Sequence, residues 1–381
     1  MSQVYDVIVI GVGGMGSATC YQLAKRGQRV LGLERFDIPH SMGSSHGDTR
    51  MLRLAYFEGQ AYVPLVLRAH QLWQEIGKLA GEHLLHMTGT LDISGPDEED
   101  IIGKAEQACR TYDLPYELLD SEAIMARYPG FKLEAKHKGL FQPDGGFVAS
   151  EKAILAHTAL AIDAGAEIRP RERVLGWEPT TSGGVKVTTE RGTYEAGSLV
   201  LSTGPWIGEF APGVIPFTQP YRQVFGWFRP RVPDLFKMGS FPSFTLKIDE
   251  GHYYGFPLWN NPGLKIGGPH HGREKCDPET LIRENRPSDE EGLRVCLSRY
   301  IPEALGTALS VRVCIYTMTP DEDFIIDRMP GMPQVVVASP CSGHGFKFAS
   351  VFGEVLADLA MDRTPAFNLE PFALSRFASR G

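Results

Sequence analysis

The sequence predicts a mixed α/β protein in which one domain has a doubly wound parallel sheet and a second, α+β domain has a mainly antiparallel sheet. The chain opens with an apolar strand, a glycine-rich turn and a helix, and the same order returns near its end. Between these units, residues 217–256 are dense in aromatic residues and prolines, which indicates antiparallel strands with loops. The 381 residues are enough for two domains.

The first unit is a strand, a turn, a helix and a second strand. Residues 5–10 are a short β-rich apolar run, and residues 11–16 form the turn. Residues 17–26 have helical spacing up to Gly27, a residue favoured just past a helix end. Residues 30–33 are the second strand. This order predicts the βαβ opening of a Rossmann-like domain.

The turn carries the dinucleotide-binding pattern G-x-G-x-x-G at Gly11, Gly13 and Gly16. These glycines permit a tight turn, approach of the backbone to a pyrophosphate and close packing of helix on strand. The following helix directs free N–H groups at the phosphates. Glu34 ends the second strand, where it can accept hydrogen bonds from ribose hydroxyls and repel a 2′-phosphate. The turn does not separate FAD from NAD, but its N-terminal position and the second such unit favour FAD.

The remaining elements follow in order along the chain. We expect a helix from Pro64, a helix at 151–164, a β-meander through 174–193, a strand at 198–202, a strand at 335–338, a glycine turn at 342–345 and a helix at 346–361. We therefore expect a discontinuous FAD-binding domain at residues 1–85, 148–215 and 325–381, and a substrate domain at residues 86–147 and 216–324.

Composition argues against several classes of protein. The net charge of −8 disfavours a nucleic-acid partner. No apolar run approaches the roughly 18 residues that span a bilayer, and the short run at residues 7–10 lacks the basic segment of a signal peptide. The six cysteines are scattered, without zinc-like spacing. We expect a cytoplasmic protein without a metal or a membrane contact, as a monomer or weak homo-oligomer.

Four separated motifs make the sequence specific: residues 43–50 followed by Arg53, residues 311–317, residues 320–327 and residues 342–347. Together they resemble the monomeric sarcosine oxidase and N-methyltryptophan oxidase family, within the D-amino-acid-oxidase-like superfamily, over essentially the whole chain. The resemblance implies an FAD-dependent oxidase of amino acids with a secondary amine. The substrate would lose a hydride equivalent, its imine would hydrolyse, and O2 would become hydrogen peroxide.

Cys314 has two interpretations. From its position alone, between apolar neighbours on a strand, it is a buried core thiol. The resemblance instead implies that Cys314 carries the flavin through a thioether, formed when a thiolate adds to the 8-methyl position of oxidised flavin. We therefore expect FAD to be covalently attached at Cys314.

The resemblance also implies roles for other residues. Arg53 and Lys347 are expected to hold the substrate carboxylate, the arginine by a bidentate grip and the lysine as a point charge. A cation early in a helix, as at Lys347, is unfavourable unless an anion lies nearby. Lys265 is expected beside the flavin, where a cation assists oxygen reduction. The other expected catalytic residues are His270, Arg50, His46 and Tyr254; the other substrate contacts are Tyr254, Tyr316 and Thr245; the other cofactor contacts are Arg35, Ser44, His46, Thr49, Arg50, Gly343, Gly345, Phe346 and Lys347.

The chain departs from the family pattern in four places, one of which is Cys341, where the family has a small or apolar residue before Ser342. Ser45 replaces the first of two adjacent histidines, and a longer spacer after Lys265 leaves His270 and His271 as alternatives. Thr245 replaces a larger apolar residue, which bears on the choice of substrate. The alternatives are the same chemistry on N-methyltryptophan, iminodiacetate or pipecolate, a dehydrogenase with another electron acceptor, which Lys265 disfavours, and a non-catalytic dinucleotide-binding regulator.

Overall fold

The computed structural model describes residues 4–96, 100–268 and 274–380. Its strands form three sheets, of eight, nine and three strands. The mixed α/β class expected from the sequence is confirmed, with a largely parallel sheet and a mainly antiparallel one in the same chain. None of the helices in the described ranges is long and apolar enough to cross a membrane.

The eight-stranded sheet has a parallel centre. It consists of β1 (Val4–Ile10), β2 (Val30–Leu33), β9 (Glu167–Arg169), β10 (Val174–Pro179), β11 (Val185–Thr189), β12 (Thr193–Leu201), β19 (Ile325–Met329) and β20 (Met332–Ser339). β1 pairs in parallel with β2 and β12. The apolar residues of β1 run without alternation because both faces are covered: Val7 and Val9 pack towards the helices, and Ile8 and Ile10 towards the meander.

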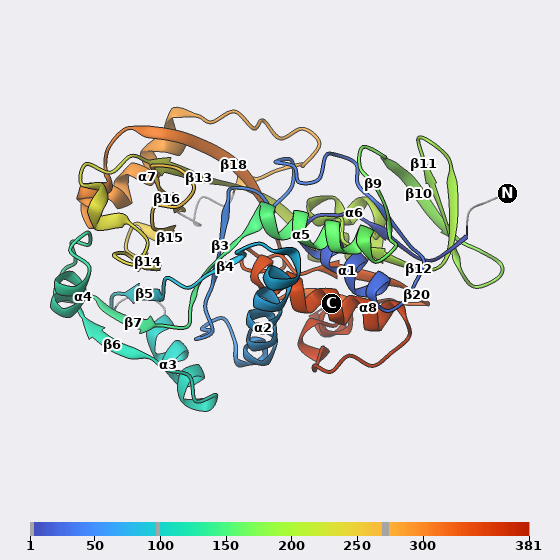
Figure 1. Ribbon diagram of the computed structural model, residues 1–381, viewed down its shortest axis with the longest axis horizontal. Helices are drawn as coiled ribbons and strands as arrows, with labels where there is room; N and C mark the ends of the chain where they lie inside the picture. The colour runs from blue at the N-terminus through green and yellow to red at the C-terminus, as the bar shows by residue number, and fades with distance from the viewer. Residues whose placement is uncertain (1–3, 97–99, 269–273, 381) are drawn as a thin grey trace.

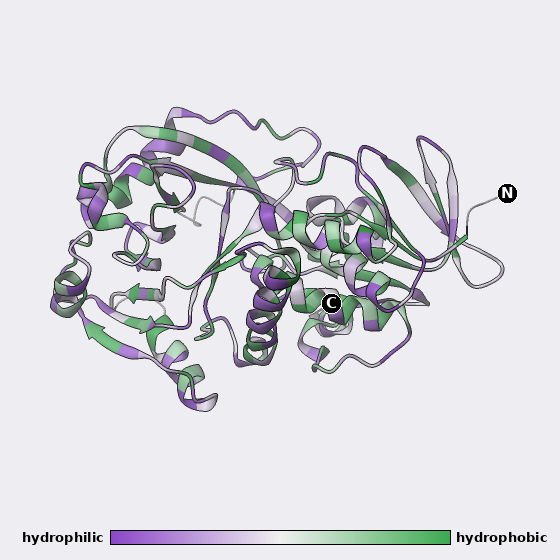
Figure 2. Ribbon diagram, viewed as in Figure 1, coloured by the Kyte–Doolittle hydropathy of each residue, from purple (hydrophilic) through white to green (hydrophobic). Residues whose placement is uncertain are grey.

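Helices cover one face of this sheet. They are α1 (Gly14–Lys25), α5 (Ser150–Asp163) and α8 (Ala349–Ala360), and α1 contacts both of the others. At Gly353 of α8 a Cβ would come within 2.8 Å of the Ala18 backbone, so the small residue permits the close packing of α8 on α1. α2 (Val63–Ala80) packs beside α5 and α8 by one apolar face, and its ribbon carries both green and purple in Figure 2.

The nine-stranded sheet forms the other half of the molecule. It consists of β5 (Thr90–Ser94), β6 (Glu117–Asp120), β7 (Lys138–Gln142), β13 (Gln219–Phe228), β14 (Ser243–Ile248), β15 (Gly251–Phe256), β16 (Leu264–Gly267), β17 (Glu274–Lys275) and β18 (Ala308–Met318). β14 and β5 pair in parallel, and the other described pairings are antiparallel. Phe131, Phe241 and Phe244 are in its core. The antiparallel strands β13, β14 and β15 fall in the segment 217–256, where aromatic density predicted such strands.

Shorter elements complete the chain. They are the helices α3 (Ile101–Thr111), α4 (Ser121–Arg127), α6 (Ile207–Phe210) and α7 (Pro287–Tyr300), and a small sheet of β3 (Thr49–Leu52), β4 (Leu85–His86) and β8 (Gly146–Ala149). In Figure 1, β3 and β4 lie between the half that holds α1, α5 and α8 and the half that holds α3, α4 and α7. The domain boundaries expected from the sequence remain a proposal.

Two expected elements differ in detail. The strand expected at 198–202 is the second half of β12, because Gly197 continues the strand instead of ending it. The helix expected at 346–361 begins as a 3-10 turn at Phe346–Phe348 before α8. This tight turn places Lys347 before the regular helix.

Candidate active site

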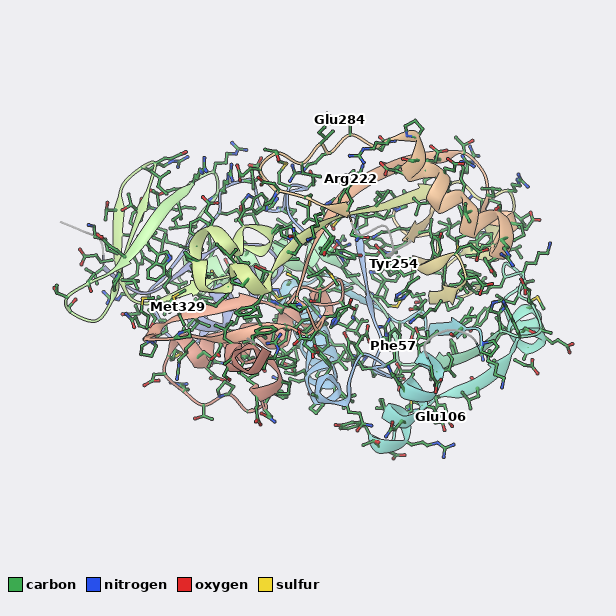
Figure 3. All side chains as sticks on the ribbon, turned by 180° about the vertical axis from the view of Figure 1, so that it is seen from behind. Phe57, Glu106, Arg222, Tyr254, Glu284 and Met329 are labelled. Atoms are coloured by element: carbon green, nitrogen blue, oxygen red, sulfur yellow. The ribbon has the colours of Figure 1, made fainter. Side chains whose placement is uncertain are left out.

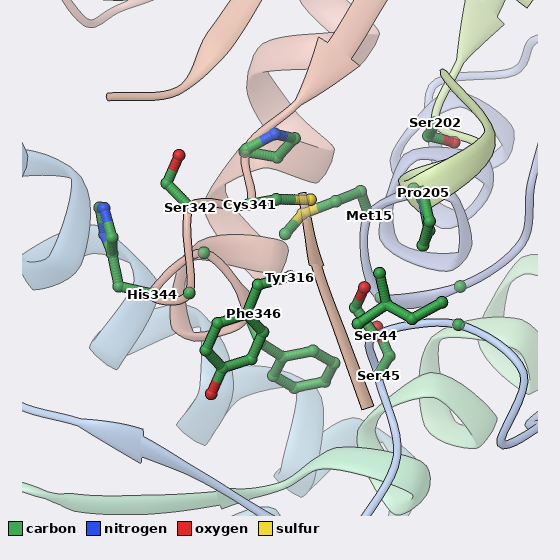
Figure 4. Close-up of a pocket in the computed structure, with 18 of the residues that line it drawn as sticks. Met15, Ser44, Ser45, Ser202, Pro205, Tyr316, Cys341, Ser342, His344 and Phe346 are labelled. Atoms are coloured by element: carbon green, nitrogen blue, oxygen red, sulfur yellow. The ribbon is translucent and has the colours of Figure 1, made fainter. Parts of the chain in front are cut away.

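A cavity of about 500 Å³, a volume typical of ligand sites, is lined by residues from both large sheets. Its lining extends from the glycine turn after β1 to β14, β15 and β18. Figure 4 looks into this cavity, with Tyr316 and Phe346 across from Ser44 and Ser45. The predicted glycine turns at both ends of the chain therefore contribute to one site.

The glycine turn after β1 forms one end of the cavity. Gly11 has a φ of +88°, and a Cβ on Gly16 would lie 1.8 Å from the Gly11 carbonyl oxygen, so glycine is required at both positions. A Cβ on Gly13 would meet no protein atom within 4 Å, and Gly13 lines the cavity. The backbone at Gly13 is therefore open to a ligand at the start of α1, where a pyrophosphate is expected.

Glu34 and Arg35 follow β2 at the same end of the cavity. Glu34 is buried and accepts the backbone N–H groups of Val12 and Phe36, each at 2.9 Å. Burial raises the pKa of Glu34, and these two amides oppose the shift. The Arg35 guanidinium pairs with Glu279. The carboxylate of Glu34 is thus fixed where a ribose-binding acid was predicted.

The residues expected around the flavin ring belong to the segment 44–50 or contact it. Arg50 lines the cavity and donates to the carbonyl oxygens of Ser44 at 2.7 Å, His46 at 2.5 Å and Thr49 at 2.8 Å. Lys265 is 2% exposed, and its Nζ donates to Thr49 O at 3.0 Å and Thr49 Oγ1 at 3.1 Å. His46, Thr49 and Lys265 are not among the lining residues and lie behind them.

Several buried polar atoms of the described residues lack a hydrogen-bond partner at this site: Ser44 Oγ, Thr203 Oγ1 and both ring nitrogens of His46. Burial and then the charge of Arg50 lower the pKa of His46 to about 3, so its imidazole is neutral. Buried polar groups are normally bonded, and Ser44 and Thr203 line the cavity. The unpaired polar atoms, together with the open backbone at Gly13 in the glycine turn (residues 11–16, the glycine cradle), fit a polar dinucleotide such as FAD.

Cys314 is on β18, and its side chain lies beside the backbone of Ser44. Its Sγ is directed at the carbonyl oxygens of Ser44 and Ile315, both at 3.8 Å, and the residue is 2% exposed. Burial raises the pKa of the Cys314 thiol, and the charge of Arg50 opposes this. Phe225 and Trp227 of the neighbouring strand pack against it. Cys314 is not among the residues that line the cavity, although Ile315 and Tyr316 are, so its thiol lies behind the lining near Ser44.

Arg53 and Lys347 lie beside Tyr56 in the wall of the cavity. Both are buried and line the cavity. The Arg53 guanidinium carbon and Lys347 Nζ lie over the ring of Tyr56, at 5.5 and 4.9 Å from its centroid. The structure thus brings together the two cations that the sequence places 294 positions apart (347 minus 53). Two buried cations in one wall form an anion site.

Arg53 is held from several sides. Nη1 donates to Thr245 Oγ1 at 3.2 Å and lies 3.9 Å from Asp92 Oδ1. Nη2 donates to Glu58. Burial opposes ionisation of Glu58, but the charge of Arg53 lowers its pKa to about 2. Arg53 Nε has no hydrogen-bond partner among the described residues, so the guanidinium keeps a donor for a substrate carboxylate while it pairs with Glu58. The charge of Glu58 also raises the pKa of Lys347.

Lys347 is held by a directed chain of hydrogen bonds. Nζ donates to the Tyr56 hydroxyl at 3.3 Å and to the His344 carbonyl at 2.9 Å. The Tyr56 hydroxyl is 2.6 Å from His344 Nδ1, and His344 Nε2 is 3.1 Å from the carbonyl of Glu322. Burial and the charge of Arg53 lower the pKa of Lys347 to about 7.

The other expected substrate contacts also meet at this cavity. Tyr254, Tyr316 and Thr245 line it, and the hydroxyls of the two tyrosines are 3.4 Å apart. Thr245 lies opposite Tyr254 in the β14–β15 pair. Figure 3 shows Tyr254 and Phe57 on different segments of the same region. His270 and its alternative His271 lie outside the described residues.

The predicted cofactor contacts near the C-terminus reach the same cavity. Gly343, Gly345, Phe346 and Lys347 all line it. A Cβ on Gly14 of α1 would lie 2.8 Å from the Phe346 ring, so the two glycine turns are packed against each other. Across the described chain, no group of three metal-ligating side chains is present.

Sequence reasoning missed four residues that shape the site: Tyr56, Glu58, Asp92 and Glu151. Asp92 left a signal, because an acid within the apolar strand Thr90–Ser94 must be buried beside a partner. Glu58 and Tyr56 left none, since their partners Arg53 and Lys347 meet through the tertiary fold. Glu151 occupies the first turn of α5 and was taken only as a helix start.

Comparison with known proteins agrees with this geometry. The family model described as FAD dependent oxidoreductase (DAO) matches residues 6–359. Monomeric sarcosine oxidase of Bacillus sp. (strain B-0618) is 39% identical over 381 residues, covering 99% of this chain and 97% of that protein. N-methyl-L-tryptophan oxidase of Citrobacter koseri is 38% identical over 374 residues, covering 98% of this chain and 99% of that protein.

A solved structure shows the same arrangement. NikD, an unusual amino acid oxidase essential for nikkomycin biosynthesis, has a TM-score of 0.85 and 27% identity, covering 98% of each chain. The resemblance noted from the four motifs is confirmed. The chain belongs to the DAO family of FAD-dependent oxidoreductases.

Proposed function

We propose that the protein oxidises amino acids that carry a secondary amine, such as sarcosine, with FAD as cofactor and O2 as electron acceptor, and that it releases hydrogen peroxide. The observation that carries this proposal is the pair Arg53 and Lys347, which are buried together in the wall of the cavity that the glycine turn also lines. A carboxylate held there places the adjacent amine near Tyr254 and Tyr316. The curated relatives named for sarcosine and N-methyl-L-tryptophan support it.

The two cations also select the protonation state of the substrate. Like charges lower the pKa of an ammonium group, so Arg53 and Lys347 favour the neutral amine, whereas the ionised Glu58 opposes this effect. We expect the amine to bind without its proton, in which case no strong side-chain base is needed at the start of the reaction. FAD supplies the two-electron acceptor. Thr245, Tyr254 and Tyr316 form the walls that orient the carbon to be oxidised.

The residues around 44–50 have the remaining roles. Arg50 and His46 are assigned to the flavin ring, where a donor or cation stabilises added negative charge. Lys265 is assigned to the reduction of O2, since its ammonium group lies just behind this segment. His270 keeps its sequence-based assignment. The cytoplasmic location, the state as a monomer or weak homo-oligomer, and the division into two domains remain predictions.

FAD is proposed to be attached through Cys314. The position of Sγ beside the Ser44 carbonyl supports this assignment. Burial raises the pKa of the thiol, and the nearby charge of Arg50 opposes that rise. Acid precipitation of the purified protein should leave a yellow pellet. A Cys314→Ala variant should release its FAD to the supernatant, whereas a Cys20→Ala control, in α1, should not. A colourless pellet from the wild-type protein would overturn the assignment.

A peroxide-release screen tests the substrate class. Sarcosine, N-methyltryptophan, iminodiacetate and pipecolate are supplied separately, with glycine and dimethylamine as controls that lack the N-substituent or the carboxylate. At least one of the four should give peroxide, and dimethylamine should not. Peroxide from dimethylamine at a rate equal to that from sarcosine would contradict the assigned role of the Arg53–Lys347 pair.

A further inference from the structure

A turn at residues 47–49 separates Lys265 from a carboxylate that the proposed mechanism does not use. Glu151, the second residue of α5, accepts the backbone N–H of Gly47 at 2.6 Å and of Asp48 at 3.0 Å. From the other side, Lys265 Nζ donates to the carbonyl oxygens of Gly47 at 2.5 Å and Thr49 at 3.0 Å. The carboxylate thus accepts N–H groups of the turn, and the ammonium group donates to its carbonyl oxygens. The peptide dipoles between them stabilise the negative charge on Glu151 and the positive charge on Lys265.

The turn needs this support from both sides. Gly47 has a φ of +100° and Asp48 a φ of +70°, a left-handed backbone that is unfavourable for a non-glycine residue. A Cβ on Gly47 would lie 2.5 Å from the Phe225 ring. Ser150 N donates to the Asp48 carbonyl at 2.9 Å. The backbone from 47 to 49 is thus fixed between α5 and Lys265.

The surroundings of Lys265 make its charge depend on few groups. The rings of Phe225, Trp227 and Phe256 lie 4.7, 5.7 and 5.0 Å from Nζ. Burial lowers the pKa of Lys265 well below its usual range, and Arg50 on β3 lowers it further. The groups that oppose this are, in order, Glu151 on α5, Asp48 in the turn and Cys314 on β18. His46 also faces this cluster, but it is neutral.

We propose that Glu151 is a positioning residue for oxygen reduction, acting as the counter-charge that keeps Lys265 cationic through the turn at 47–49. The proposal rests on the role assigned above to Lys265. Glu151 is not one of the residues that line the cavity, so it acts through Lys265 and not on the substrate. A cation beside the reaction site stabilises the negative charge that develops on oxygen.

Glu151→Gln removes the charge and can keep the hydrogen bonds. One carboxylate oxygen, Oε1, lies 2.6 Å from Gly47 N and 3.2 Å from Asp48 N, so an amide oxygen there serves both. The new NH2 group can donate to Ser150 Oγ, which is 2.5 Å from Oε2. The change therefore tests the charge of Glu151 separately from its grip on the turn.

The experiment measures the oxidative half-reaction alone. Wild-type and Glu151→Gln holoenzymes are reduced with dithionite under argon and then mixed with O2. The pH is varied from about 6 to 10, which covers values below the ordinary pKa of a lysine side chain. The rate should fall as Lys265 loses its proton. In the variant this step should move to lower pH by about one unit or more. For a displacement of one unit, the variant should be roughly two- to fivefold slower between the two midpoints, about tenfold slower above the wild-type midpoint, and equal to wild type at the acid end.

A second readout does not depend on turnover. The absorbance of the oxidised flavin, titrated with base, should show the same step, displaced in the same direction in the variant. Asp48→Asn should give a smaller displacement, because Asp48 raises the pKa of Lys265 less than Glu151 does. Asparagine tolerates a positive φ, so the turn should be kept. Glu82→Gln, which removes a charge from the exposed pair with Lys152, should give none. Lys265→Met should abolish the step in both backgrounds.

Two results would overturn the proposal. Equal midpoints in wild type and Glu151→Gln, by both readouts, would show that the carboxylate does not set the charge of Lys265. A slower reaction at every pH, without a displaced step, would show a purely structural role. Failure of the proposed function would look different: no amine of the substrate screen would reduce the wild-type flavin, and dithionite reduction does not depend on that result.

Discussion

The Arg53 guanidinium and the Thr245 hydroxyl are joined by a hydrogen bond of 3.2 Å at the floor of the cavity. The same threonine also hydrogen-bonds Asp92, whose pKa is raised by burial and lowered by Arg53 and by this bond. Thr245 thus links the substrate-binding cation to a buried acid on the neighbouring strand β5. The departure from a larger apolar residue at this position therefore makes Arg53 part of a polar network.

Thr245→Val should weaken binding of a simple carboxylate. Valine keeps the shape but leaves one N–H of Arg53 without its acceptor, which costs about 1–2 kcal/mol, or roughly tenfold in Kd. Titration of the flavin absorbance with a non-oxidisable carboxylate such as acetate measures this change. Thr245→Ser, which keeps the hydroxyl, is the control. Equal Kd values for valine and threonine would show that Arg53 needs no help from this side chain.

Carboxylate binding should also weaken as the pH rises above 7. Burial and Arg53 lower the pKa of Lys347 to about 7 in the free site, so the lysine is charged below that pH and loses its charge above it. The Kd of acetate should be flat below pH 7 and rise above it, by up to tenfold per unit. Lys347→Met should bind weakly at every pH and show no such rise. A flat profile in the wild type would contradict this assignment.

Tyr56→Phe tests the chain that holds Lys347. The phenol is the acceptor for Lys347 Nζ and lies 2.6 Å from His344 Nδ1. Without it the ammonium form loses a hydrogen bond, so the pH at which acetate affinity begins to fall should move lower. The same acetate titration measures the displacement. A step at the wild-type pH would show that the His344 carbonyl alone supports Lys347.

The glycine turn allows folding to be separated from cofactor binding. In Gly13→Ala the new Cβ meets no protein atom within 4 Å, so stability should stay close to wild type while FAD incorporation falls. In Gly16→Ala the Cβ would lie 1.8 Å from the Gly11 carbonyl, which should cost roughly 3 kcal/mol or more. Thermal unfolding and flavin content of each variant check this. Normal FAD content in Gly13→Ala would contradict the placement of the pyrophosphate.

Local sequence patterns predicted the elements that depend on neighbouring residues. β2 was expected at residues 30–33 and is found at Val30–Leu33, because a short apolar run before an acid has few alternatives. The strand expected at 198–202 was too short, since β12 begins at Thr193 and continues through Gly197 to Leu201. The 3-10 turn before α8 was also missed, since helical spacing does not distinguish the two helix types.

The site was predicted where a motif carries it and missed where the tertiary fold creates it. Gly11, Gly13 and Glu34 follow from a local pattern, and Arg53 and Lys347 from a resemblance. Glu151 has no local mark of its contact with the turn at 47–49, because that contact joins residues 104 positions apart. Its role depends on the charges around Lys265, which the order of residues along the chain does not specify.

The central claim is that this chain is an oxidase of secondary-amine amino acids, and an anaerobic titration followed by air tests it most directly. Sarcosine, or the best substrate of the screen, should bleach the flavin absorbance under argon. Air should then restore the absorbance and release one hydrogen peroxide per flavin. A flavin that stays oxidised with all four amines, or that is reduced by them but returns no peroxide in air, would contradict the account.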